Sequence, residues 1–451
     1  YDLKEKPAFL KLEQLELNLG MTGHIAGKKL NYGRQTILQK ILAEKSGQEK
    51  VEIGEVIDIE PDFTLSMTDV HSVVKYFQEK GFGYVWNPNR VALALDQFIS
   101  SQLGETAISH KAVRDFSKKQ NIKNLFDSRE GICHQVIIEK GLILPGQLAL
   151  ATDNQIVSCG CIGAFALSIN SSQMANLWVS GKTEIKVPET IKVIINGRLS
   201  RGVYARDVIL FIGKNLVNEG IDNRVIEFYG STASQMSISE RFTLSHQATA
   251  LGAGSAIFPF DSVVRRYLTG RTRMPYRPAF ADKDVLYTKT FEFNVGQLTP
   301  QVLRSGSVSG IVPVAELEGL PIDQVVIGSC ANGRFEDLRI AADILKGRKV
   351  HPDTRLLIYP SSREVYLETL KKGLIRAFVE AGAIVMNPGH EPYSDTGETI
   401  LAPGERCLST GGGNTPDVKR TGAEDIYFVS PATAAASAVK GIITDPTGYI
   451  K

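Results

Sequence analysis

Residues 324–345 read QVVIGSCANGRFEDLRIAADIL, and this stretch decides the fold class. The apolar run at residues 324–328 predicts a buried strand, the small residues at 329–333 predict a turn, and residues 337–345 predict a helix. The pattern then repeats, with a strand at 355–360, a helix at 363–381 and a strand at 383–386. Strands and helices that alternate over short connections are typical of a parallel sheet, so we predict an α/β fold.

Two loops of this pattern are candidate sites, because ligands of open α/β sheets bind beyond the carboxyl ends of the strands. The first loop, residues 329–333, contains Cys330, and the second, residues 387–393, contains His390. A thiolate near a helix N-terminus has a lowered pKa, although a turn with a buried, inert cysteine fits the pattern equally well. A histidine in such a loop is a metal ligand or a general base, or else an incidental residue of a surface turn.

Upstream, the chain contains further stretches of mixed helix and strand patterns. Helical spacing at residues 36–45 and 71–80 alternates with a strand pattern at 51–61, and a second unit begins with a strand at 190–197. Arg, Pro, Asp and Lys are frequent at residues 271–290, so we expect a linker there. The chain is therefore predicted to form three domains, at residues 1–178, 179–290 and 291–451.

Composition excludes several functional classes. Of the 451 residues, 43% are hydrophobic and 22% are charged, which excludes a disordered, a collagen-like and a membrane-bundle chain. The formal net charge of +2 argues against a nucleic-acid partner. The odd number of five cysteines indicates a reducing compartment. Neither a signal segment nor an apolar run long enough to span a membrane is visible, so we expect a cytoplasmic protein without a membrane partner.

Three further segments carry weaker signals. GICHQ at residues 131–135 contains His134, for which a histidine satisfied by backbone at the start of an element is the plain alternative. Cys159 and Cys161 form a C-x-C pair that suits a soft metal, or else are two small residues packed in a Gly/Ala-rich segment. STGGGN ends at Asn414, and an ordinary loop fits it better than an anion site built from backbone N–H groups.

Taken together, these segments resemble the aconitase superfamily, above all the large subunits of 3-isopropylmalate dehydratase and homoaconitase. The matching motifs follow the family's order over nearly the whole chain. They are QTILQKIL at residues 35–42 with GE at 54–55, GICHQ at 131–135, KVPET at 186–190, EFYG at 227–230, IGSCANGR at 327–334 and SPATAAA at 430–436.

The resemblance implies three aconitase-like α/β domains around a central cleft. It implies that three cysteines hold a [4Fe–4S] cluster there, and that a small hydroxy-polycarboxylate loses and regains water at an open iron. Because the chain ends where the family's large subunits end, we expect the swivelling fourth domain to be absent from this chain. The predicted partner is therefore a separate small subunit that carries this domain.

The sequence departs from the family at the positions of the family's active-site residues. Only Cys330 matches a cluster cysteine, and His390 and Tyr393 occupy the positions of the other two. A single cysteine cannot hold an ordinary [4Fe–4S] cluster, so we do not expect one. Four further family residues are replaced: a histidine by Gln97, a histidine by Gln155, a glutamate by Ala250 and an arginine by Gly413.

Three hypotheses remain open. In the first, the protein is a divergent hydro-lyase or isomerase that acts on a small hydroxy-carboxylate, with a single iron or zinc at a rebuilt site. In the second, His134 and His390 act as acid and base without a metal. In the third, the protein is a non-catalytic scaffold or a subunit of a larger complex.

The candidate site residues follow from the matched positions. The predicted catalytic residues are His134, Asp153 and His390. The predicted substrate-binding residues are Ser329, Asn332 and Asn414. The predicted metal ligands are Cys330, His390, His246 and Cys159. The substrate stays unnamed, because the arginines that would bind a polycarboxylate are replaced.

Overall fold

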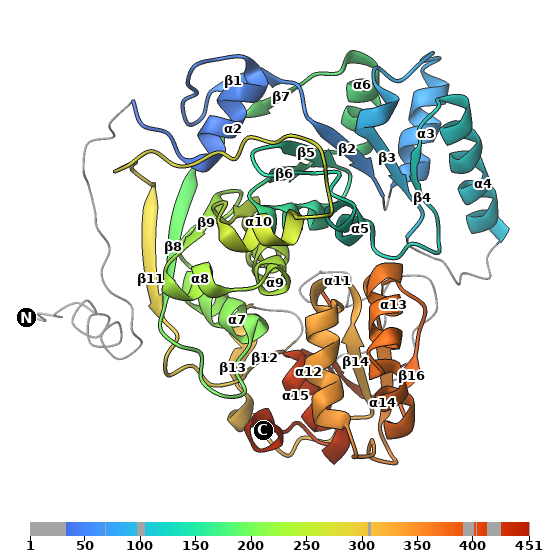
Figure 1. Ribbon diagram of the computed structural model, residues 1–451, viewed down its shortest axis with the longest axis vertical. Helices are drawn as coiled ribbons and strands as arrows, with labels where there is room; N and C mark the ends of the chain where they lie inside the picture. Colours follow the sequence, from blue (N-terminus) through green and yellow to red (C-terminus); the bar gives the residue numbers. More distant parts are fainter. Residues whose placement is uncertain are drawn as a thin grey trace, which may run out of the picture.

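The computed structural model describes residues 33–67, 69–96, 104–304, 308–390, 401–402, 404–412 and 425–450. These residues form three larger sheets and a two-stranded ribbon, with helices packed on the sheet faces (Figure 1). Within the described ranges, no helix is long and apolar enough to cross a membrane. Asn414 and Tyr393 lie outside these ranges.

The first sheet has five parallel strands in the order β4-β3-β2-β5-β6. Its central strands are buried on both faces, which suits the near-continuous apolar runs in their sequences. The strands are β2 (Phe63–Ser66), β3 (Val91–Ala94), β4 (Asn124–Phe126), β5 (Leu148–Ala151) and β6 (Phe165–Ser168). The helices that follow or precede them are α2 (Ile37–Ser46), α3 (Val70–Glu79), α4 (Gly104–Lys119), α5 (Cys133–Glu139), η2 (Asn154–Ile162) and α6 (Ser171–Ser180).

The strand predicted at residues 51–61 lies outside this sheet. It is β1 (Val56–Ile59), which pairs in antiparallel fashion with β7 (Thr183–Lys186). Its residues alternate between exposed and buried, as expected for a ribbon with one covered face.

The second sheet has four parallel strands in the order β10-β9-β8-β11. The strands are β8 (Thr190–Asn196), β9 (Val225–Tyr229), β10 (Ser255–Ile257) and β11 (Lys289–Asn294). The helices are α7 (Ala205–Leu216), α8 (Ser231–Gln235), α9 (Ile238–Ala248) and α10 (Ser262–Leu268). Helix α9 packs closely on η2 of the first unit, and a Cβ at Gly160 would meet the Ala256 carbonyl oxygen at 1.6 Å.

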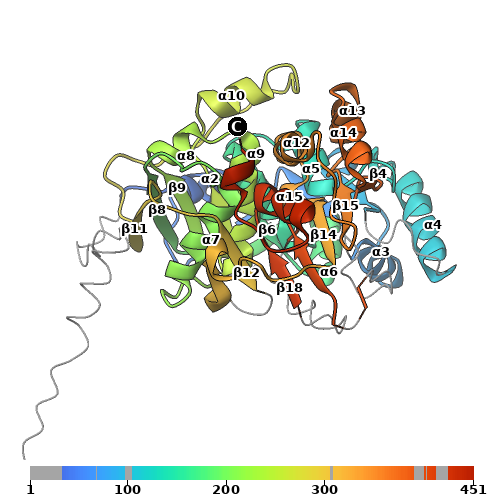
Figure 2. The same cartoon turned by 90° about the horizontal axis from the view of Figure 1, so that it is seen from below.

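The third sheet has seven strands in the order β13-β12-β18-β17-β14-β15-β16. Strands β14 to β18 are parallel to one another, whereas β12 runs antiparallel to both β18 and β13 at one edge. The strands are β12 (Gln301–Arg304), β13 (Ile311–Pro313), β14 (Gln324–Gly328), β15 (Arg355–Tyr359), β16 (Ile384–Val385), β17 (Arg406–Ser409) and β18 (Asp425–Phe428). The helices are α11 (Ser329–Asn332), α12 (Phe335–Leu345), α13 (Arg363–Lys371), α14 (Leu374–Ala381) and α15 (Pro431–Lys440), and Figure 2 shows α15 beside α12.

The mixed α/β architecture with parallel sheets is confirmed, and two local expectations differ. The predicted helix at 363–381 is two helices, because Gly373 adopts a left-handed φ of 78° and interrupts the helical hydrogen bonds. The segment at 329–333, expected to be a turn, forms the short helix α11. The domain boundaries at 178 and 290 stay a prediction; the second sheet itself continues to Asn294.

Residues 269–288 connect α10 to β11 without a helix or strand, as the linker prediction requires. Figure 1 shows this segment in yellow, where it crosses the molecule from α10 toward α2. Asp282 holds it to the start of α2, since its carboxylate accepts hydrogen bonds from Lys40 Nζ at 2.5 Å and from the Gln35 backbone N–H at 2.7 Å. We call residues 269–288 the crossing segment.

Candidate functional site

Three histidines from three separate elements converge in the interior. His134 lies on α5, His246 in the last turn of α9, and His390 in the loop after β16. The ring centroid of His134 lies 5.5 Å from that of His246 and 6.3 Å from that of His390. His134 also stacks on Phe242, one turn before His246, at 5.6 Å. That these three histidines form one functional site stays a prediction.

The GICHQ segment places His134 by a close backbone approach. Gly131 has a φ of 93°, and a Cβ there would lie 2.6 Å from the carbonyl oxygen of Ser361. The Ile132 N–H donates to the same oxygen at 2.8 Å. Only glycine fits this contact, and the contact holds the start of α5 against the loop that follows β15 in the third unit.

Burial keeps two of the histidines neutral at pH 7. Desolvation, with smaller contributions from His246, His390 and Arg334, holds the pKa of His134 well below its usual value. Desolvation, followed by Arg334, lowers the pKa of His246 to about 3. A neutral imidazole can accept a proton, accept a hydrogen bond or bind a metal. His134 and His246 are therefore in the protonation state that general-base catalysis or metal binding requires.

Several buried polar atoms around the histidines make no hydrogen bond. They are Nε2 of His246, Nε2 of His390, Oδ1 of Asn332, Oδ1 of Asp96, and Nε and Nη1 of Arg334. A buried polar atom without a partner costs about 1–3 kcal/mol, and such atoms are few in folded proteins. Their concentration at one place indicates that a ligand, an ion or ordered water belongs there.

Asp96 is a site residue that was not predicted. It follows the carboxyl end of β3, it is buried, and its Oδ2 accepts a hydrogen bond from the Cys133 N–H at 2.9 Å. His390 Nε2 lies 3.9 Å from this oxygen. Burial raises the pKa of Asp96, and the charge of His390 opposes the rise. The signal in the sequence was its place directly before Gln97, where the family's D-H motif has its histidine; its partner His390 is 294 positions away.

Cys330 and Asn332 lie on α11, at the carboxyl end of β14. Gly328 has a φ of 123°, and a Cβ there would lie 1.9 Å from the Tyr359 carbonyl oxygen, so glycine lets the chain turn into α11. A Cβ at Gly412 would lie 3.1 Å from Sγ of Cys330 and 3.6 Å from Cε1 of His246. The thiol of Cys330 and the imidazole of His246 therefore both lie close to Gly412.

Asn332 and Arg334 are fixed by their neighbours. Asn332 Nδ2 donates to Oγ1 of Thr243 at 3.1 Å and to Oδ1 of Asp337 at 3.0 Å. Arg334 donates to the same hydroxyl at 2.7 Å, and its guanidinium lies 4.3 Å from the ring centroid of Phe242. Both side chains are thus held in one orientation against α9.

The other predicted residues have different surroundings. Asp153 caps η2, because its Oδ1 accepts a hydrogen bond from the Gln155 N–H at 2.8 Å, and its charge contributes to the raised pKa of Asp96. Ser329 is buried with a φ of 64°. Cys159 packs in an apolar cluster with Cys133 and Cys161, where burial raises the pKa of its thiol. Asn414 lies outside the described residues.

The described side chains do not fit an ordinary [4Fe–4S] cluster. Cys133, Cys159, Cys161 and Cys407 form no disulfide and lie in apolar clusters, which leaves Cys330 as the cysteine beside the histidines. Within the described ranges, no group of three or more His, Cys, Asp and Glu residues is arranged to hold a metal ion. A cubane cluster requires thiolates from several cysteines.

Known proteins resemble this chain over most of its length. The sequence profile of the aconitase family (aconitate hydratase) matches residues 84–441. The 3-isopropylmalate dehydratase large subunit 1 of Methanopyrus kandleri is 39% identical, over 92% of this chain and 100% of that protein. A probable 3-isopropylmalate dehydratase large subunit and a probable methanogen homoaconitase large subunit, both of Methanothermobacter thermautotrophicus, are 41% and 35% identical, over 91% and 92% of this chain and 98% of each protein. The crystal structure of Thermococcus kodakaraensis aconitase X (holo-form) aligns with a TM-score of 0.48 at 14% identity, over 86% of this chain and 92% of that chain.

Proposed function

Because the chain belongs to the aconitase family, we propose that it is a hydro-lyase that acts on a small hydroxy-carboxylate at a rebuilt active site. Its relatives are named as dehydratase and homoaconitase large subunits, which supports this reaction class. One observation carries the proposal: polar atoms without partners converge around His134, His246 and His390. A scaffold that had lost its site would gain stability by filling this space with apolar side chains.

The reaction requires removal of a proton next to a carboxylate and departure of a hydroxyl group. His134 and His390 are the proposed acid and base, since a neutral imidazole can take up a proton and release it to the leaving oxygen. Asp96, 3.9 Å from His390, is placed to stabilise the protonated form of that imidazole. Asp153 retains its predicted role beside them, because its charge acts on Asp96.

The proposed substrate-binding residues are Asn332, Ser329 and Asn414. Asn332 Oδ1 is buried and without a partner, so it is available to accept a hydrogen bond from a hydroxyl group. Ser329 is the first residue of α11, at the carboxyl end of β14 where ligands of parallel sheets bind.

We further propose that Cys330, His246 and His390 hold a single iron or zinc, which requires their side chains to move closer together than they are in the described structure. The mixed sulfur and nitrogen donors suit either ion, and an open position would polarise the substrate hydroxyl or carboxylate. Support comes from the unpartnered Nε2 atoms of His246 and His390 and from the approach of Cys330 and His246 at Gly412. Cys159 is not retained in this set, because its surroundings are apolar.

Metal and sulfide analysis of protein purified without oxygen tests this proposal. We expect about one equivalent of iron or zinc per chain and no acid-labile sulfide. His390→Ala and Cys330→Ser should each lower the metal content by more than half, whereas Cys407→Ala, a buried cysteine on β17, should not. An iron–sulfur absorbance spectrum with stoichiometric sulfide would contradict the proposal.

A metal-free acid–base enzyme is the second candidate. It is favoured by the finding that no three described His, Cys, Asp or Glu residues are arranged around a metal position. This candidate predicts dehydration activity on hydroxy acids that survives prolonged chelation and is lost in His134→Gln. Absence of metal together with absence of any hydroxy-acid binding would leave the scaffold hypothesis.

A small subunit is the proposed partner. The relatives in the comparison are named large subunits, which implies a second chain. Co-expression of this chain with a small subunit of the same family, followed by size-exclusion chromatography, tests whether the two form a stable complex.

A further inference from the structure

A basic patch with exposed apolar side chains lies at the outer surface of the molecule, on α10 and the crossing segment (Figure 2). Residues 262–281 contain five arginines but no Lys, Asp or Glu. Four of these arginines are exposed and form no ion pair with any residue that the structure describes. They are Arg265, Arg266, Arg273 and Arg277. We call these four arginines, together with Met274 and Phe280, the basic patch.

Aromatic contacts connect α10 to the crossing segment within the patch. The Arg265 guanidinium lies 5.6 Å from the ring centroid of Phe260. The rings of Tyr276 and Phe280 lie 5.8 and 6.4 Å from the same centroid. Phe280 is 51% exposed and Met274 is 48% exposed. Arginine, aromatic and methionine side chains that share one exposed surface are typical of protein–protein interfaces.

The acidic residues that border this stretch in the sequence do not balance its charge. They are Asp261, Asp282 and Asp284, and each is paired with a cation outside the basic patch. A partner that covers the patch therefore has to bring acidic side chains of its own.

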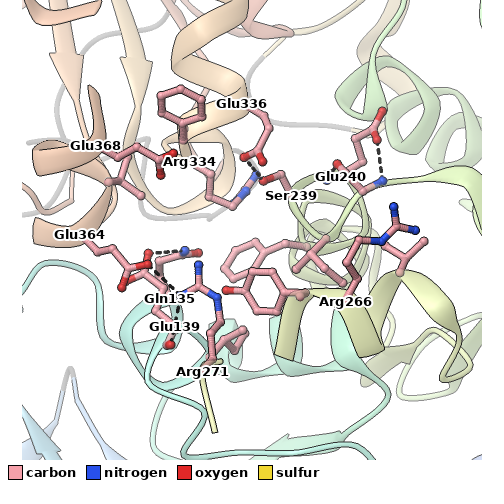
Figure 3. Close-up of a pocket in the computed structure, with 18 of the residues that line it drawn as sticks. Gln135, Glu139, Ser239, Glu240, Arg266, Arg271, Arg334, Glu336, Glu364 and Glu368 are labelled. Carbon is pink, nitrogen blue, oxygen red and sulfur yellow. Dashed lines mark hydrogen bonds and ion pairs between the residues drawn. The ribbon is translucent and has the colours of Figure 1, made fainter. Parts of the chain in front are cut away.

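A groove of about 460 Å³ adjoins the basic patch (Figure 3). Helices α5, α9, α10, α12 and α13 contribute to its walls, and its lining includes Arg266 of the patch. Because these helices come from all three units, a chain bound over the groove contacts each unit. We call it the glutamate groove, since five of its lining residues are glutamates.

The glutamate groove has the opposite charge to the patch. Two of its three arginines are already paired, Arg334 with Asp337 at 2.9 Å and Arg271 with Glu364 at 2.8 Å. Three of its glutamates form no ion pair among the residues that the structure describes, and they are Glu240, Glu336 and Glu368.

Adjacent surfaces of opposite charge favour a protein partner over a nucleic acid. The basic patch would attract a phosphate backbone, but the carboxylates of the neighbouring groove would repel it. A protein can present acidic side chains to the patch and a basic side chain to the groove, and such complementarity fixes the orientation of the two chains.

From this arrangement we infer that the basic patch and the glutamate groove form the docking surface for the small subunit, which places acidic side chains opposite the patch and a lysine or arginine in the groove. The inference rests on the partner proposed above and adds the surface to which that partner binds. The relatives named as large subunits imply such a second chain.

Binding of a purified small subunit of the same family to the full chain, measured by biolayer interferometry, tests the inference. The double variant Arg265→Glu/Arg273→Glu should weaken the complex about tenfold or more, because it places carboxylates opposite the partner's carboxylates. Glu368→Lys should also weaken it about tenfold, although this substitution changes the net charge in the other direction. All three side chains are exposed, so the melting temperature of each variant should match that of the wild type.

Exposed residues elsewhere supply the matched controls. Arg198→Glu, after β8, and Glu184→Lys, on β7, should leave the Kd of the complex unchanged. If the two controls weaken the complex as much as the patch and groove variants do, or if Arg265→Glu/Arg273→Glu and Glu368→Lys shift the Kd in opposite directions, only net charge matters and the inference is wrong.

The remaining outcomes separate this inference from the proposed partner. An unchanged Kd in both the patch and the groove variants would overturn the inference, while the proposed partner stands. If the wild-type chain binds no small subunit, the proposed partner and the inference are both wrong. Binding of a single-stranded oligonucleotide that is lost in Arg265→Glu/Arg273→Glu, with an unaffected complex, would assign the patch to nucleic acid instead.

Discussion

At the scale of single residues, Glu139 links protonation to stability. It is buried, its Oε1 accepts hydrogen bonds from Gln135 and Ser362 at 2.8 Å each, and burial raises its pKa from 4.5 to about 7. Since the folded-state pKa lies above the unfolded one, the stability associated with protonated Glu139 is complete below pH 4.5 and is lost as the pH rises to about 7.

Glu139→Gln should therefore stabilise the protein at neutral and alkaline pH. Glutamine resembles the protonated acid and can keep both hydrogen bonds, so the free energy of unfolding of the variant, relative to the wild type, should rise by up to about 3 kcal/mol between pH 4.5 and pH 7.5. Thermal unfolding of both proteins across this range measures the effect. Glu368→Gln, a change at an exposed glutamate on α13, serves as the control. Parallel pH profiles of wild type and Glu139→Gln would contradict the assignment.

Residue-level prediction from sequence was possible where a residue occupies a motif position, and it was not possible where a contact joins distant positions. His134, His246, His390 and Cys330 were identified because they occupy motif positions. The pairing of Asp96 with His390 could not be predicted, because two strand ends from different sheets meet there. The apolar surroundings of Cys159 likewise depend on α9 and β10 packing against η2.

At the scale of elements, the turn from β14 into α11 depends on Gly328. Gly328→Ala should destabilise the protein by about 3 kcal/mol or more, because the new Cβ would lie 1.9 Å from a carbonyl oxygen of β15 at a φ of 123°. Gly373→Ala is the matched control: its φ is 78°, but no atom lies within 4 Å of the added Cβ, so a cost of about 1 kcal/mol is expected. Thermal unfolding compares the two variants. Equal losses of unfolding free energy would show that the contact between residue 328 and the Tyr359 carbonyl oxygen is unimportant.

Strand and helix positions in the third unit followed from apolar periodicity, and the exceptions have local causes. The strand predicted at 324–328 has the same bounds as β14. The single helix predicted at 363–381 is interrupted by the left-handed conformation of Gly373. Helical spacing continues on both sides of that glycine, so the pattern alone cannot show the interruption. Helix α11 was missed because four residues are too few for a periodic signal.

At the scale of the whole molecule, sheet order depended on pairings that span long separations in sequence. Strand β11 joins β8 of the second sheet after about a hundred residues, and β12 pairs with β18 across the third unit. The linker predicted at residues 271–290 is without helix or strand up to residue 288, and its last two residues belong to β11. The prediction did not indicate that the crossing segment packs on other parts of the chain, where a Cβ at Gly146 would lie 2.0 Å from the Arg277 carbonyl oxygen.

The crossing segment should resist proteolysis only while Asp282 holds it to α2. Its trypsin sites are Arg271, Arg273 and Lys283, because Arg277 precedes Pro278 and trypsin does not cleave an Arg–Pro bond. Asp282→Asn removes the charge that pairs with Lys40 at 2.5 Å, and we expect a loss of about 1 kcal/mol together with faster tryptic cleavage between residues 269 and 288. Asp284→Asn is the control, because its ion pair with Arg34 is largely exposed and contributes little. Mass spectrometry of timed digests measures both variants, and an unchanged cleavage rate in Asp282→Asn would mean that the contacts near Gly146, rather than the contact with α2, hold the segment in place.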